Sequence, residues 1–156
     1  EQHKKIEGER KVEQLLLEEL IKKSKFELPA RLVERRLEAL VHESIQSLVY
    51  RGVKEAEALR EKESLKKNLL PEAQRQIRVS FILDEIANRE HVEATDEDLN
   101  QKYQQIADRV RRPLEEIRAY YRELEDRKES LLQQIITEKT IQRVKDKAII
   151  TEGGSK

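Results

Sequence analysis

Apolar residues recur three or four positions apart along almost the whole chain, and few helix-breaking residues interrupt them. Only four glycines and three prolines occur among 156 residues, so the chain has little of the turn chemistry that a β-sheet protein needs. Glu, Lys, Arg, Leu, Ile and Ala dominate at helical spacing. The sequence therefore predicts an all-α fold, built from extended helical hairpins more than from a compact ball.

A short extended stretch, KFELP at residues 25–29, interrupts the helical pattern. Residues 1–24 before it are predicted to form one amphipathic helix. Pro29 favours the start of a new helix, because its missing N–H would be unpaired in a first turn anyway. That second helix is predicted from Ala30 to Tyr50.

Gly52 and Pro71 mark the next two breaks. Gly52 is predicted to end the second helix, and Asn68–Pro71 is predicted to restart the chain in the same way as Pro29. The stretch that follows, IRVSFILDEIA, is the most apolar in the sequence, so its helix is expected to be buried on several sides. The helices around these breaks form one predicted pair.

The segment EATDEDL indicates a capped helix start. Thr95 can accept a hydrogen bond from the first helical turn, and Asp98 three residues later can return one, as in a capping box. Pro113 is predicted to end this helix and to open a short one. A last long helix is predicted over about 126–148, with a seam at steps of four formed by Leu132, Ile136, Thr140, Val144 and Ala148. A second helical pair is therefore expected around Pro113.

The charge balance excludes several classes of partner. Lys and Arg together number 32, as do Asp and Glu, and the net charge of zero argues against general attraction to nucleic acid or anionic lipid. No apolar run approaches the ~20 residues of a membrane-spanning helix. The absence of cysteine fits a reducing cytoplasm. Because the chain starts at Glu1 and has no methionine, we expect it to be a piece of a longer protein.

No motif predicts catalysis, and neither a metal nor another cofactor is expected. His3, His42 and His91 are too far apart in sequence to suggest a zinc site. The glycines do not form the motif of a phosphate-binding loop. The sequence also has no recognisable pairing of a Ser or Cys nucleophile with a catalytic His. The basic cluster RVRRP at 109–113 admits a phosphate site, but the acidic residues around it favour a solvated helix end.

Three segments, in this order and spacing, resemble the C-terminal domain of bacterial trigger factor. They are FELPARLV, VSFILDEIANREHVEATDEDL and RRPLEEIRAYYRELEDRKESLLQQIITEKTIQRVKDKAIITE. Trigger factor is a ribosome-associated chaperone, and the resemblance implies a helical body with two protruding arms. The arms would span about 44–78 and about 103–130 within a chaperone domain at 1–152, followed by a disordered tail at 153–156.

The function implied by the resemblance is ATP-independent holding of unfolded or nascent polypeptides in a cradle between the arms. The ribosome-binding and prolyl isomerase domains of the family are absent from this chain, so no enzyme activity and no direct ribosome contact are carried over. A homodimer is left open. The resemblance also implies that Phe26 and Leu28 plug the corner between the first two helices, where both should be buried.

Apolar residues near the breaks of the two pairs are predicted to bind polypeptide, because they cannot all be buried in two-helix pairs. These residues are Val49, Tyr50, Leu69, Leu70, Leu114, Ile117, Tyr120 and Tyr121. For the two adjacent tyrosines two interpretations stay open: an exposed apolar ledge, or one ring in the core and one outside. A helical scaffold that binds one defined partner, or a related periplasmic chaperone, is the alternative function.

Overall fold

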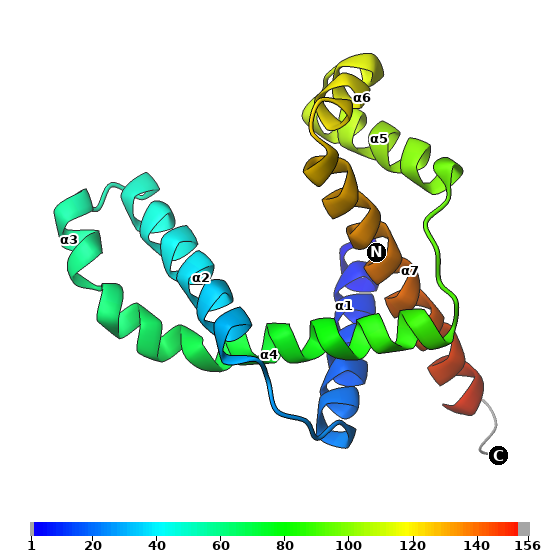
Figure 1. The fold of residues 1–156 in the computed structure, drawn as a ribbon, viewed down its shortest axis with the longest axis horizontal. Helices are drawn as coiled ribbons and strands as arrows, with labels where there is room; N and C mark the ends of the chain where they lie inside the picture. Colours follow the sequence, from blue (N-terminus) through cyan, green and yellow to red (C-terminus); the bar gives the residue numbers. More distant parts are fainter. Residues whose placement is uncertain (1, 153–156) are drawn as a thin grey trace. The chain divides into compact units, whose positions relative to one another are not determined.

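The computed structural model is helical along most of the residues it describes, which are 2–152 for the backbone and 7–148 for the side chains. No strand occurs in residues 2–152, and the predicted all-α fold is confirmed. The predicted tail at 153–156 lies outside the described residues. The helices, coloured along the chain in Figure 1, are α1 (Gln2–Lys23), α2 (Ala30–Tyr50), α3 (Glu55–Arg60), α4 (Lys62–Arg89), α5 (Asp96–Val110), α6 (Leu114–Arg122) and α7 (Glu125–Glu152).

The helices form two compact units. Unit 2 is Leu17–Ile82, and unit 1 combines Glu1–Leu16 with Leu83–Lys156. The predicted arm at about 44–78 falls inside unit 2, and the predicted arm at about 103–130 falls inside unit 1. The limits of the arms stay predictions.

Helix α2 has the predicted limits, and both ends have a local cause. The carbonyl of Pro29 accepts hydrogen bonds from the N–H groups of Leu32 (3.0 Å) and Val33 (3.2 Å), which begins the helix without a side-chain cap. Gly52 follows the other end with φ of +94°, a left-handed conformation that glycine adopts at little steric cost.

The core of unit 2 joins α2, α3 and the first part of α4. Its buried members, Val41, Ile45 and Ala58, come from α2 and α3. Half-buried apolar residues pack around them: Leu37, Leu48, Val53, Leu65 and Leu69. The predicted helical pair in this part of the chain therefore has a cluster of its own.

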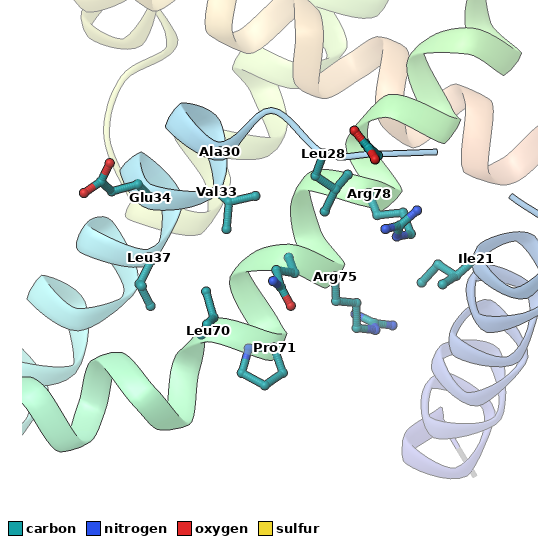
Figure 2. Close-up of a pocket in the computed structure, with 12 residues that line it drawn as sticks. Ile21, Leu28, Ala30, Val33, Glu34, Leu37, Leu70, Pro71, Arg75 and Arg78 are labelled. Carbon is teal, nitrogen blue, oxygen red and sulfur yellow. The ribbon is translucent and has the colours of Figure 1, made fainter. Parts of the chain in front are cut away.

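The predicted break at Asn68–Pro71 is wrong, because α4 continues through Pro71. Proline removes one hydrogen bond of the helix and bends it, and the axis of α4 changes direction near Pro71 (Figure 2). Packing holds the turns on both sides of the bend. Leu69 before it joins the unit 2 core, and Ala73 after it is fully buried.

The linker before α2 packs on α4, which corrects the predicted place of Phe26. Its ring is 38% exposed and makes an edge contact with Phe81, at 6.0 Å between centroids. The guanidinium of Arg78 lies over the same ring at 4.9 Å and donates a hydrogen bond to the Phe26 carbonyl at 3.0 Å. Leu28 is half-buried. The apolar stretch of α4 is itself only partly buried, since Phe81 is 39% exposed.

The core of unit 1 joins α5, α6 and α7. The predicted capping box starts α5: the N–H of Asp98 donates to Thr95 Oγ1 at 3.2 Å, and the N–H of Thr95 donates to Asp98 Oδ2 at 2.8 Å. Six buried residues from the three helices form one cluster: Leu99, Tyr103, Ala107, Ile117, Leu131 and Ile135.

Ion pairs connect α7 to other elements of unit 1. Lys139 Nζ lies 2.6 Å from Asp98 Oδ2, and Lys102 Nζ of α5 lies 2.6 Å from Glu138 Oε1. The hydrogen bond from Lys139, together with those from Thr95, lowers the pKa of Asp98 from 3.8 to about 2. The start of α5 is therefore held to α7 through one carboxylate.

Candidate functional site

A hollow lies within unit 2, between α2, α4, the linker and the end of α1. It has a volume of about 830 Å³, and we call it the α2–α4 hollow. All twelve lining residues are drawn as sticks in Figure 2, where ten of them are labelled. They are Ile21, Glu27, Leu28, Ala30, Val33, Glu34, Leu37, Leu70, Pro71, Gln74, Arg75 and Arg78.

The lining of the α2–α4 hollow is mainly apolar. Figure 2 shows Val33 and Leu37 of α2 pointing towards the part of α4 that carries Leu70 and Pro71. Leu28 reaches the same space from the linker. Hollows of this size, with apolar walls and polar groups at a few positions, are typical of binding sites for small organic groups.

Charges of both signs border this hollow. Arg75 and Arg78 come from α4, whereas Glu27 comes from the linker and Glu34 from α2. Arg78 is fixed by its bond to the linker, while neither glutamate has an ion pair among the described residues. The border can therefore accept charged groups of either sign beside an apolar side chain.

A second hollow, of about 310 Å³, lies within unit 1, and we call it the tyrosine hollow. The Arg127 guanidinium stacks over the Tyr120 ring at 4.0 Å and donates a hydrogen bond to the Tyr120 carbonyl at 3.1 Å. The stack holds the exposed ring in one orientation. The lining residues are Tyr120, Tyr121, Asp126, Arg127, Ser130, Leu131 and Gln134.

The two adjacent tyrosines point in different directions. Tyr121 is half-buried and packs against Tyr103 of the core at 5.6 Å between ring centroids. Tyr120 is 51% exposed and meets Tyr121 edge to face at 5.3 Å. The structure thus has one ring against the core and one outside, and both rings line the tyrosine hollow.

The predicted binding residues fall into three groups. Leu70, Tyr120 and Tyr121 line hollows. Val49 and Tyr50 are exposed at the end of α2, Tyr50 at 94%, but they line none of these hollows.

The third group packs against the cores. Leu69 and Leu114 are half-buried there, and Ile117 is only 7% exposed. In this conformation Ile117 is a core residue, and the surface available to a ligand excludes it. The binding role of the other predicted residues stays a prediction.

Sequence reasoning missed most of the lining of the α2–α4 hollow. Val33 and Leu37 stand on the apolar seam of α2, where a core position is the natural interpretation. Leu28, which is predicted to be buried, is half-buried and lines the hollow. These residues line one hollow because α2, the linker and α4 meet there, and spacing along α2 alone does not specify that packing.

The side chains at 7–148 offer no candidate metal site. No group of three His, Cys, Asp or Glu residues within this range could hold a metal ion. His42 and His91 are exposed, and His3 lies outside the described side chains. Within the described residues, none of the helices has the length and apolar content needed to cross a membrane.

Comparisons with known proteins agree on one family. The family described as "Bacterial trigger factor protein (TF) C-terminus" matches residues 1–146. Trigger factor of Geotalea daltonii is 30% identical over 137 residues, which is 88% of this chain and 32% of the relative. Trigger factor of Citrifermentans bemidjiense is 28% identical over the same shares. The chain thus spans about a third of the length of these curated relatives.

A solved structure has a similar fold. It belongs to work on the domains of trigger factor from Thermotoga maritima, with a TM-score of 0.59 and 21% sequence identity. The match covers 86% of this chain and 80% of that chain. At this identity the similarity supports the fold alone.

Proposed function

The chain belongs to the family of the bacterial trigger factor C-terminus, and from this premise we propose that it is a chaperone domain that holds unfolded or nascent polypeptides without ATP. The polypeptide would bind weakly through its apolar side chains. The α2–α4 hollow and the tyrosine hollow are the two binding surfaces proposed, one in each unit.

One observation carries this proposal: large apolar side chains are exposed beside hollows on a chain in which 41% of the residues are charged. Leu70 is 38% exposed at the α2–α4 hollow, and Tyr120 is 51% exposed at the tyrosine hollow. Exposed apolar residues within a charged surface mark a site that can bind apolar segments of other chains.

Holding requires neither catalysis nor a cofactor. The residues described offer no metal cluster, and we propose that the chain has no enzyme activity of its own. The chain has no methionine, so its binding surface lacks the flexible side chains that promiscuous binders often use. Affinity for any one segment should therefore be low, with several segments of a client bound in turn.

We further propose a cytoplasmic site of action, with unfolded chains as the partners. Ribosome contact would depend on a further domain, because the chain spans about a third of its relatives. A homodimer is not required, since each proposed hollow lies within a single unit of one chain.

The test is suppression of aggregation of several unrelated unfolded proteins by the chain. We expect broad, weak suppression without ATP. The double change Leu70→Ser/Tyr120→Ser should remove ~40–60 Å² of apolar contact, worth about 1–1.5 kcal/mol at ~25 cal/mol per Å². The concentration needed for half suppression should then rise roughly five- to thirteenfold.

A matched control is Leu59→Ser/Leu124→Ser, which removes two leucines exposed at 49% and 51% that line neither hollow. This variant should keep the activity of the parent. An equal loss of aggregation suppression in both double variants would show that the hollows have no special role in binding unfolded proteins. Tight binding of one protein and none of the others would favour a scaffold instead.

A further inference from the structure

A third hollow lies within unit 1, where α5, α6 and the first turn of α7 meet. Its volume is about 350 Å³, and we call it the cationic hollow. It shares no lining residue with the tyrosine hollow. Its lining residues are Leu99, Asn100, Tyr103, Arg118, Arg122 and Lys128.

The lining of the cationic hollow is positively charged, unlike the chain as a whole. Three cations line it and no carboxylate does, although the whole chain has a net charge of zero. Only Arg118 has an acidic partner, Glu115, whose side chain is 76% exposed. Among the described residues, the side chains of Arg122 and Lys128 form neither an ion pair nor a hydrogen bond. The hollow therefore attracts an anion.

Arg118 is held in place and has donors to spare. Its Nη1 donates to Glu115 Oε1 at 2.8 Å, and its Nη2 donates to Asn100 Oδ1 at 3.2 Å. Its Nε–H is buried and has no acceptor among the described residues. An arginine carries five N–H donors, so the fixed guanidinium can still donate to a ligand, and buried donors without acceptors are rare in proteins.

Tyr103 adds a neutral donor. Its ring is buried in the unit 1 core, while the residue also lines the hollow. Burial raises the pKa of its hydroxyl, with a further contribution from Tyr121. The hydroxyl therefore stays protonated at neutral pH and can donate to an anion. It has no hydrogen-bond partner among the described residues.

We propose that the cationic hollow binds a carboxylate carried by a polypeptide, either the C-terminal carboxylate or the side chain of Asp or Glu. Two guanidinium groups match the planar, bidentate geometry of a carboxylate. Leu99 supplies an apolar wall for the carbon atoms that bear it. The polypeptide origin of the carboxylate rests on the proposed function, whereas the charge and donors of the hollow do not.

The test is calorimetric titration of the chain with short acetylated apolar peptides. One peptide has a free C-terminal carboxylate, the second is amidated, and the third is amidated and carries one Glu. We expect at least one carboxylate peptide to bind about fivefold or more tighter than the amidated peptide. This preference should shrink as salt screens the charges. Equal binding of all three peptides would overturn the proposal.

Two sets of variants assign the preference to the hollow. Arg118→Gln/Arg122→Gln should abolish it, while Arg31→Gln/Arg109→Gln, which removes two exposed arginines outside the hollow, should keep it. Because the first variant breaks the bond to Asn100, Lys128→Gln and Tyr103→Phe serve as milder changes, and each should weaken the preference. A preference unchanged in all of these variants would contradict the assignment.

Inorganic phosphate distinguishes a polypeptide site from a general anion site. Phosphate should compete only at concentrations well above those of the carboxylate peptides, and competition at equal concentration would overturn the assignment to polypeptide. Aggregation assays separate this inference from the proposed function. A chain that suppresses aggregation without any carboxylate preference contradicts the inference alone. A chain that prefers carboxylates but suppresses nothing contradicts the proposed function alone.

Discussion

Two residues one turn apart on α6 have opposite roles. Ile117 is 7% exposed within the unit 1 core, and Tyr120 is 51% exposed beside the tyrosine hollow. Ile117→Ala should lower the free energy of unfolding by about 2–5 kcal/mol, because it leaves a cavity among packed side chains. Tyr120→Ala should cost about 1 kcal/mol or less, chiefly through the lost stack with Arg127. Chemical denaturation of both variants measures the difference.

The two variants should rank in the opposite order when the loss of binding to unfolded protein is measured. Under conditions where both variants are folded, Tyr120→Ala should bind unfolded protein more weakly and Ile117→Ala should bind it as the parent does. Similar unfolding midpoints for the two variants would mean that the α6 face is assigned wrongly.

At the scale of elements, Asp98 links the start of α5 to α7. The hydrogen bond from Lys139 and those from Thr95 hold its pKa at about 2, below the usual 3.8. A carboxylate with a lowered pKa in the folded state stabilises the protein above its unfolded pKa, and this contribution is lost as the pH falls through about 2. The parent should therefore lose stability between about pH 5 and pH 2 by more than Asp98→Asn does.

The control for this prediction is Asp96→Asn. This change removes a carboxylate from the same helical turn, where Asp96 has no ion pair among the described residues. Its unfolding midpoint should follow the pH dependence of the parent. If the unfolding midpoint of Asp98→Asn has the same pH dependence as that of the parent, the ion pair between Asp98 and Lys139 contributes nothing to stability.

At the scale of the whole molecule, each unit has a separate core. Ile45 is buried with residues of α2 and α3, and Ile135 is buried with residues of α5, α6 and α7. Each Ile→Ala change should destabilise its own cluster by about 2–5 kcal/mol. Amide hydrogen exchange should therefore accelerate mainly within unit 2 for Ile45→Ala and mainly within unit 1 for Ile135→Ala. Equal acceleration in both units for both variants would indicate one cooperative unit.

Local chemistry made much of the fold predictable from the sequence. The limits of α2 at Ala30 and Tyr50 and the capping box of Thr95 and Asp98 are confirmed. Each depends on residues within about four positions along the chain, where backbone geometry and capping bonds decide the outcome. Pro71 shows the limit of this reasoning, because packing on both sides keeps α4 continuous through a residue that usually ends a helix.

Burial on α7 was predictable only in part. A repeat of four residues predicts Leu132 and Ile136 on its seam, whereas Leu131 and Ile135 are the residues buried against α5 and α6. Thr140, further along, is buried as the repeat predicts. Since a helix turns every 3.6 residues, a fixed step of four drifts around it, and the partner helix selects which residues face the core.

The sequence by itself determined the helical character of the chain, the limits of α2 and the cap of α5, because these depend on neighbouring residues. Tertiary structure decided which apolar side chains stay exposed. Phe26 meets Arg78, 52 positions further along, and Arg118 meets Asn100, 18 positions earlier. The hollows arise from such distant contacts, and their shape follows from how whole helices pack, which spacing along one helix does not specify.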